Sequence, residues 1–419
     1  MKSWRSVTWR ALFAATAGCA ALWPGMVMAQ AVGSASVATS VLPAAPPPDH
    51  YSVQTQVKET LDYDSNPLLS SSAHKTAYGS ITTPDLTFNA DTPTEHLDAD
   101  LSAVLNRYNL QGFDSNDLHS KLHANHQDSD WSAGLGVMLD YDTTRTSEWN
   151  TSGRNVAGIR RTAYQLAPQW SFSPTPVDLL SFSGSYASNI YSNTTLYTNY
   201  DTYSFSPSLT HVFDPQNSGV LALQTSRYQT TSGSQVSFNG VGFTGGWRYL
   251  ASPTLTLSGD LGMQRNEGSF TNQPGTLTYD MTADASATWK GQQDTLSLTA
   301  TRSTVPQASG TEAETTSFTF SDLHQLSPRL DTQWNATYQF SDYPGSSSGT
   351  QYVQKSYANF NPHLIYHLTE EVKIDLSYLF KTQVMETLGN QTGGSQSSAH
   401  SQAVLLSFIY APLSDALKW

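Results

Sequence analysis

Hydrophobic and polar side chains alternate strictly over residues 330–341. The even-numbered positions carry Leu, Thr, Trp, Ala, Tyr and Phe, and the odd-numbered positions carry Asp, Gln, Asn, Thr, Gln and Ser. Successive side chains of a β-strand point to opposite faces, so this pattern predicts a strand with one apolar and one polar face. A typical globular strand has about five or six residues, whereas a tilted strand that crosses a bilayer needs about nine to eleven. The length of this stretch therefore favours a transmembrane strand.

Clusters of turn-forming residues divide the chain after Tyr51 into units of about forty residues, each typical of one hairpin of two long strands. Their centres fall near residues 90, 129, 173, 214, 252, 291, 327 and 369. Propeller blades repeat at a similar period but consist of four short strands. Eight tight turns with one extra strand at each end predict an all-β, antiparallel transmembrane barrel of about 18 strands, with 16 as the alternative count.

The two ends of the sequence predict three regions. Residues 1–29 resemble a signal peptide, with Lys2, Arg5 and Arg10 before an apolar run and a cleavage-like site at Ala29. Residues 30–49 are rich in Pro, Ala and Ser and are expected to form a periplasmic tail. Residues 50–419 are expected to form the barrel. Tyr410 either closes the last strand or continues through a bulge toward Trp419.

Composition excludes several classes of protein. Cleavage after Ala29 removes the single cysteine, Cys19, so disulfides are excluded from the mature chain. It also leaves 18 of the 21 basic residues against 34 acidic ones, a net charge of −16. This balance argues against nucleic acid as a partner, since nucleic-acid binding depends on basic contacts to phosphate. A hydrophobic content of 38% is too low for a helical membrane protein of this size.

The polar strand faces supply the candidate site residues. They alternate with apolar positions and are therefore expected to line the barrel interior, the lumen. The lumen-lining candidates are His96, Asp98, Asp100, Asn106, His119, Lys121, His123, Arg161, Asp331, Gln333, Asn335, Lys373 and Asp375. None of the outer loops is long enough for a folded plug domain, so we expect any obstruction to come from side chains or a modest inward-folded loop.

The sequence predicts no catalytic residues, no cofactor and no metal. His119 and His123 share one face of a strand and could bind a metal, but strand spacing alone is weak evidence, and a polar lumen lining is the interpretation that we prefer. Serine, histidine and aspartate are scattered along the polar faces, and no motif singles out one serine as a nucleophile. We therefore expect a protein that is not an enzyme.

One stretch resembles a known family. Residues 61–69, Leu-Asp-Tyr-Asp-Ser-Asn-Pro-Leu-Leu, are similar to the first hairpin of proteobacterial outer-membrane barrels associated with exopolysaccharide biosynthesis, close to the β-barrel porin group. The signal peptide, the Pro-rich tail and the Ser-Pro turns agree with this resemblance. It implies a Gram-negative outer-membrane location and a part in exopolysaccharide export or assembly. It supplies no catalytic residues.

Other functions stay open at this stage. The principal alternative is a general diffusion porin for small hydrophilic solutes, with a cation preference because of the acidic excess. A barrel enzyme and a structural or adhesive barrel are further alternatives, because a barrel fold alone does not define function. The expected partners are outer-membrane lipid, the barrel-insertion machinery and either a polysaccharide or small solutes.

Overall fold

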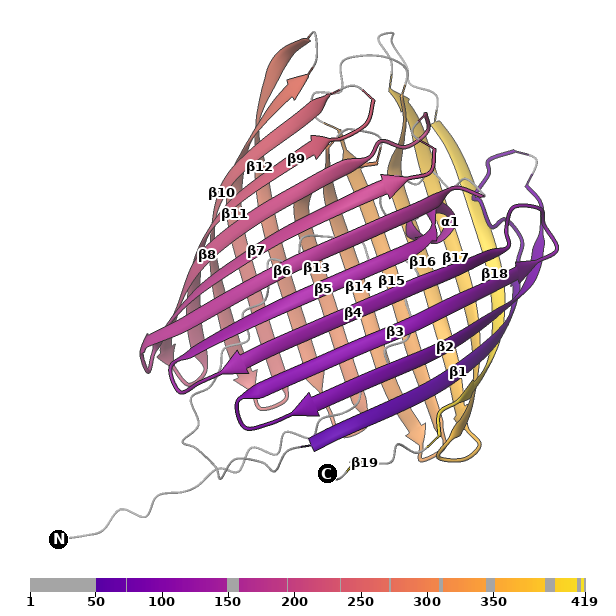
Figure 1. Ribbon diagram of the computed structural model, residues 1–419, viewed down its shortest axis with the longest axis horizontal. Helices are drawn as coiled ribbons and strands as arrows, with labels where there is room; N and C mark the ends of the chain where they lie inside the picture. The colour runs from indigo at the N-terminus through magenta and orange to yellow at the C-terminus, as the bar shows by residue number, and fades with distance from the viewer. Residues whose placement is uncertain are drawn as a thin grey trace.

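The computed structural model is a closed antiparallel β-barrel of eighteen long strands (Figure 1). It describes residues 50–419 except 73, 149–157, 194, 234, 271–272, 309–311, 344–350, 389–395, 413–415 and 418–419. The predicted signal peptide and Pro-rich tail therefore lie outside the described residues. Among the described residues, no helix is both long and apolar enough to cross a membrane.

Each strand from β1 to β18 pairs with the next one along the chain, and β18 returns to pair with β1. The strands are β1 His50–Asp64, β2 Ala77–Asp91, β3 Glu95–Tyr108, β4 Ser115–Gln127, β5 Trp131–Thr143, β6 Arg160–Thr175, β7 Asp178–Tyr191, β8 Tyr200–Asp214, β9 Asn217–Thr230, β10 Val236–Ser252, β11 Leu255–Phe270, β12 Gln273–Lys290, β13 Asp294–Pro306, β14 Glu312–Ser327, β15 Leu330–Asp342, β16 Gln351–His367, β17 Val372–Leu388 and β18 Gln396–Tyr410. The count of eighteen confirms the sequence prediction.

The sequence left two courses open for the C-terminal end: a last strand that ends at Tyr410, or one that continues toward Trp419. The structure combines parts of both. β18 ends at Tyr410, and a two-residue strand, β19 (Ala416–Leu417), then pairs with Ser52 and Tyr51 of β1. The ladder between β1 and β18 covers Val57–Asp64, so β19 occupies the edge of β1 nearer its start. Closure of the barrel thus uses two separate pieces of the C-terminal chain.

The connections differ in length at the two ends of the barrel. At the end where β1 begins, the connections are short turns, from 215–216 between β8 and β9 to 368–371 between β16 and β17. We call this the turn end. The opposite end, the loop end, carries most of the longer connections, including 65–76 and 144–159, the second of which contains the single-turn helix α1 (Thr144–Ser147). Outer-membrane barrels show the same asymmetry.

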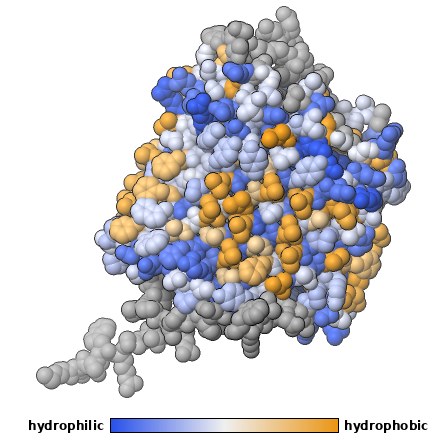
Figure 2. Space-filling view, viewed as in Figure 1, coloured by the Kyte–Doolittle hydropathy of each residue, from blue (hydrophilic) through white to orange (hydrophobic). Residues whose placement is uncertain are grey.

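Strand β15 shows how the alternating sequence determines the two surfaces of the wall. Trp334 and Tyr338 are exposed on the outside, whereas Asn335, Gln339 and Ser341 are buried on the inside. The same division runs around the barrel, and Figure 2 shows a band of apolar side chains across its middle with polar side chains above and below. Exposed aromatic residues such as Tyr141 and Trp170 belong to this outer face. Such a band fits the hydrocarbon layer of a membrane.

Candidate functional site: the lumen and its inward-folded segments

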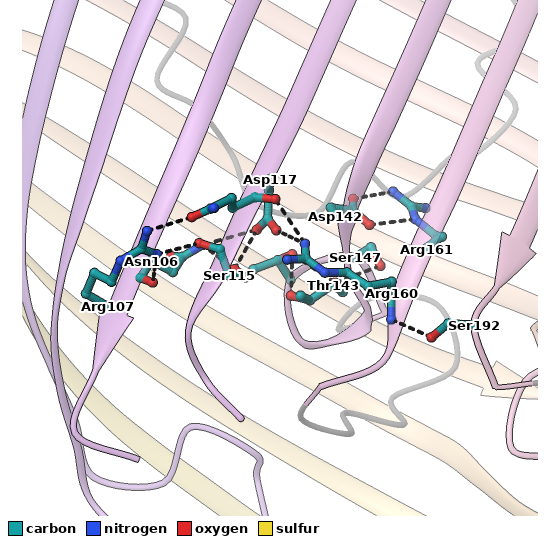
Figure 3. Close-up of polar contacts among 12 residues, drawn as sticks. Asn106, Arg107, Ser115, Asp117, Asp142, Thr143, Ser147, Arg160, Arg161 and Ser192 are labelled. Atoms are coloured by element: carbon teal, nitrogen blue, oxygen red, sulfur yellow. Dashed lines mark hydrogen bonds and ion pairs between the residues drawn. The ribbon is translucent and has the colours of Figure 1, made fainter. Parts of the chain in front are cut away.

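The inner wall of β3–β7 carries a network of charged side chains. Arg161 donates two hydrogen bonds to Asp142, at 3.0 and 2.7 Å (Figure 3). Its guanidinium also lies 3.8 Å from the carboxylate of Asp140. His119 contacts the other side of Asp140, with 2.8 Å between Nδ1 and Oδ1. The strands hold these residues in place, because Asp142 and Arg161 are register partners on β5 and β6, and His119 and Asp140 are partners on β4 and β5.

A second part of the network lies closer to the loop end. Asn106 donates to Ser115 at 2.8 Å and to Asp117 at 3.1 Å, and Arg160 donates to the other oxygen of Asp117 at 2.6 Å (Figure 3). Asn106 and Asp117 are almost fully buried. Charge-assisted hydrogen bonds of this kind are among the stronger polar contacts, so this wall is held rigidly.

The chain after β5 turns into the lumen. The guanidinium carbon of Arg145, in α1, lies 4.9 Å from the ring centre of Tyr108 and 5.3 Å from that of Phe113. Glu148 accepts a hydrogen bond of 2.7 Å from the hydroxyl of Tyr191 on β7. Residues 144–148 therefore cover the inner wall from β3 to β7. This agrees with the expectation of a modest inward-folded loop rather than a plug domain.

The connection between β1 and β2 also folds inward. Leu69 is buried against Tyr357 of β16 and Ala399 of β18. Its φ of 45° is uncommon for a residue other than glycine, and the burial of its side chain offsets the conformational cost. The side chain of Asn66 fixes the start of this connection by donating to the carbonyl oxygens of Ser70 and His400, at 2.9 and 3.1 Å.

A third segment, residues 307–308 after β13, meets the connection between β7 and β8. The amide of Thr198 donates to the carbonyl of Ala308 at 2.7 Å, and the hydroxyl of Tyr228 donates to the carbonyl of Gln307 at 3.3 Å. Gln307 and Tyr197 are each 1% exposed. We call residues 66–70, 144–148 and 307–308 the inward-folded segments. All three narrow the lumen at the loop end.

The predicted lumen residues lie on strands β3, β4, β6, β15 and β17, and the structure does not gather them into one site. His96, Asp98 and His123 lie together, as do Asn106, His119 and Arg161 within the network of β3–β7. Separate contacts involve Asp100 with Thr87 (2.8 Å), Asp331 with His367 (2.8 Å) and Asp375 with His363 (3.0 Å). Asn335 is buried, Lys121 pairs in register with Asp100, and Gln333 and Lys373 lie farther around the wall on β15 and β17.

Sequence reasoning missed the contributions of Arg145, Glu148 and Leu69. These residues lie in connections, where no periodic pattern indicates direction, and their partners are tens to hundreds of residues away. In the sequence, Arg145 looks like any solvent-exposed cation in a polar loop. Asp140 and Asp142 carried the same signal as the predicted lumen residues, because they alternate with Leu139 and Tyr141.

Comparison with known proteins gives matches in structure alone. No family model matches the chain, and no curated protein matches it in sequence. Similar solved structures include the outer-membrane channel DcaP of Acinetobacter baumannii (12% identity, TM-score 0.41) and OccK2 (OpdF) of Pseudomonas aeruginosa (10%, 0.45), each covering 87% of this chain and 98% of its own. The ferric citrate transporter FecA is 7% identical with a TM-score of 0.46, covering 85% of this chain and 78% of its own. These neighbours are Gram-negative outer-membrane barrels.

Proposed function

We propose that this protein is an outer-membrane channel for small hydrophilic solutes. The observation that carries the proposal is the combination of an outward apolar band with a polar lumen narrowed at the loop end by the inward-folded segments. The apolar band fits lipid, and the polar interior suits water and polar solutes. The Gram-negative outer membrane is the location that this arrangement supports, with the turn end facing the periplasm.

The narrowing favours small solutes over a polymer. Arg145 and Glu148 are buried against Tyr108 and Tyr191 inside the barrel, and they hold residues 144–148 against the inner wall. A solute must pass the segment that they anchor, so the size of the solute controls its entry. The acidic excess of the chain further favours cations. The family resemblance supports exopolysaccharide export as a second candidate, and both candidates can be separated in one experiment.

The test is the conductance of the refolded full chain in planar bilayers, with and without acidic and neutral polysaccharides. A steady, cation-preferring conductance that polysaccharide leaves unchanged is the expected result. Arg145→Ala releases α1 from two aromatic rings and should raise the conductance, whereas Lys121→Ala, on the lumen face nearer the turn end, serves as the matched control. A silent barrel that polysaccharide opens, or a conductance that polysaccharide blocks, would replace our proposal with the export function.

A further inference from the structure

Three side chains of the types that bind metals meet on the inner wall close to the turn end. His96 and Asp98 belong to β3 and His123 to β4, and one candidate ligand atom of each lies within 4.8 Å of the other two. Asp98 and His123 are direct register partners, and His96 is two residues from Asp98 on the same strand face. The backbone ladder therefore fixes the three Cβ atoms relative to one another.

The ring of His96 is already oriented by its neighbours. Its Nδ1 contacts the carboxylate of Asp91, its register partner on β2, and its Nε2 lies 2.5 Å from Oδ2 of Asp98. A histidine ligand in a metal site commonly shares its second ring nitrogen with a carboxylate, which fixes the ring and its tautomer. Asp91 is placed for this supporting role, which leaves Nε2 directed toward the cluster.

The wall beside His123 carries two glycines. His123 pairs with Gly136 of β5, and the next inward position along that strand is Gly134. The side chain of Gln169 from β6 fills the space over Gly134, where a Cβ atom would approach it to 2.5 Å, and its Nε2 reaches to 3.4 Å from Nε2 of His123. Gly136 has no such cover, which leaves room for the imidazole of His123 to turn toward His96.

We propose that His96, Asp98 and His123 bind a divalent transition-metal ion. Two imidazole nitrogens and one carboxylate oxygen suit zinc, copper or nickel rather than calcium or magnesium, which prefer oxygen ligands alone. Two ligand atoms that each lie about 2.1 Å from a tetrahedral ion are about 3.4 Å apart. Side-chain rotations that move the ligand atoms by about 1 Å would therefore bring the cluster to this geometry. Three protein ligands leave a further position open to water or to a passing solute.

The site is accessible from the lumen and does not depend on the proposed channel function. The side chains of His96 and Asp98 are 43% and 34% exposed. Asp91 and Asp100 lie on the same inner wall, at positions paired with His96 and Lys121, and add negative charge that attracts a cation. The inference departs from the expectation drawn from the sequence. That expectation considered His119 and His123 as a possible metal-binding pair but predicted no metal site. In the structure His119 contacts Asp140 instead.

The experiment uses the full chain, folded in detergent and without a histidine affinity tag. Cu²⁺ is titrated into it, and binding is followed by electron paramagnetic resonance. The expected signal is one tightly bound Cu²⁺ per barrel with splitting from two imidazole nitrogens. His96→Asn and His123→Asn should each remove one nitrogen from the splitting and weaken binding at least about tenfold. Asp91→Asn removes the supporting carboxylate and should weaken binding about tenfold while both nitrogens remain.

His119→Asn is the matched control, because it lies on the same face of β4 but contacts Asp140 outside the cluster. It should leave both the splitting and the affinity unchanged. Folding of every variant is checked by the heat-dependent change in gel migration. Asp98→Asn replaces the proposed carboxylate ligand by an amide of the same shape and should weaken Cu²⁺ binding while both nitrogens remain. The proposal is overturned if the parent chain binds no Cu²⁺ tightly, or if His119→Asn weakens binding as much as His96→Asn and His123→Asn.

Discussion

The barrel has two seams at which neighbouring strands share only a short ladder. β1 and β18, at opposite ends of the chain, pair over Val57–Asp64, the half of β1 nearer the loop end. β12 and β13 are consecutive strands joined by a short turn, yet their ladder covers only Ala283–Lys290, the half nearer the turn end. The first is the closing seam, and the second we call the split seam.

Side chains reinforce the two seams differently. At the closing seam Thr60 and Ser407 are hydrogen-bonded at 2.9 Å, and Lys381 donates to Asp64 at 2.9 Å across the intervening β18. At the split seam the ladder stops beyond Ala283, and Thr304 instead donates to Asp280 at 3.2 Å through its side chain. Proximity in sequence therefore does not determine how long a ladder two neighbouring strands share, and side-chain contacts supplement the ladder at both seams.

The outer face of the wall beside the split seam also carries smaller side chains. Small residues, among them Gly245, Gly259, Ala285 and Ala300, line a shallow apolar groove of about 660 Å³ over β10–β14. Small side chains leave less apolar surface in contact across neighbouring strands, so packing contributes less to cohesion there. The comparison thus predicts that the wall opens first between β12 and β13.

The largest expected effect comes from breaking the closing seam at Asp64. Asp64→Ala removes the carboxylate that Lys381 and Ser401 contact, and both of these side chains are buried. Removing one partner of a buried ion pair costs about 3–5 kcal/mol. We expect the midpoint of urea unfolding in lipid vesicles, followed by tryptophan fluorescence, to fall accordingly.

The control for this change lies beside the split seam, between β13 and β14. Glu314→Ala breaks the pair between Glu314 and Arg302, whose charged atoms are 2.7 Å apart and whose side chains are 14% and 32% exposed. These two strands share a continuous ladder from Asp294 to Pro306, so the loss of this partly exposed pair should cost less than about 3 kcal/mol. Equal losses for Asp64→Ala and Glu314→Ala would contradict the special role of the buried ion pair at the closing seam.

The wall between the seams provides the reference for membrane insertion. Trp334 of β15 is exposed on the outer face, and Gln333 faces the lumen and is half-buried. Trp334→Arg places a charge against lipid and should cost about 2–4 kcal/mol, whereas Gln333→Arg should cost less than about 1 kcal/mol. The yield of folded barrel in lipid vesicles measures both, and equal yields would contradict the assignment of the two faces.

The smallest effect is a difference in hydrogen exchange that requires no substitution. Residues 276–282 of β12 pair with β11 but not with β13, whereas residues 57–64 of β1 pair on both sides. Amides of 276–282 that face β13 should exchange at least about tenfold faster than those of 57–64, which corresponds to about 1.4 kcal/mol of opening free energy. Similar protection in the two segments, measured by mass spectrometry, would show that the split seam is closed in solution.

The sequence predicted the barrel well because two of its determinants are local. The alternation in residues 330–341 depends only on strand geometry, and β15 covers 330–342. Turns such as that after Asp214 depend on a few adjacent residues, and each of the eight short turns lies within three residues of a predicted centre, although the centres at 90 and 173 fall inside β2 and β6. The split between β12 and β13 was not predicted, because the alternation of Asp280 and Met281 continues through it without interruption.

The candidate site was predicted in part. Alternation assigned His96, Asp98 and His123 to the lumen face, but their meeting depends on the register of β3 against β4, and a shift of two residues would separate them without changing the pattern. The inward positions of Arg145 and Leu69 depend on contacts with distant aromatic and aliphatic side chains. A single sequence carries no record of such contacts.

The inward-folded segments have an electrical consequence. In the channel that we propose, ions would meet the loop end and the turn end one after the other, so the two regions would act as resistances in series, and the narrower one would limit the current. Because residues 66–70, 144–148 and 307–308 all lie at the loop end, that end should dominate the resistance. Substitutions at His123, near the turn end, should then change which ions are retained without changing the current, and substitutions at Arg145 should do the reverse.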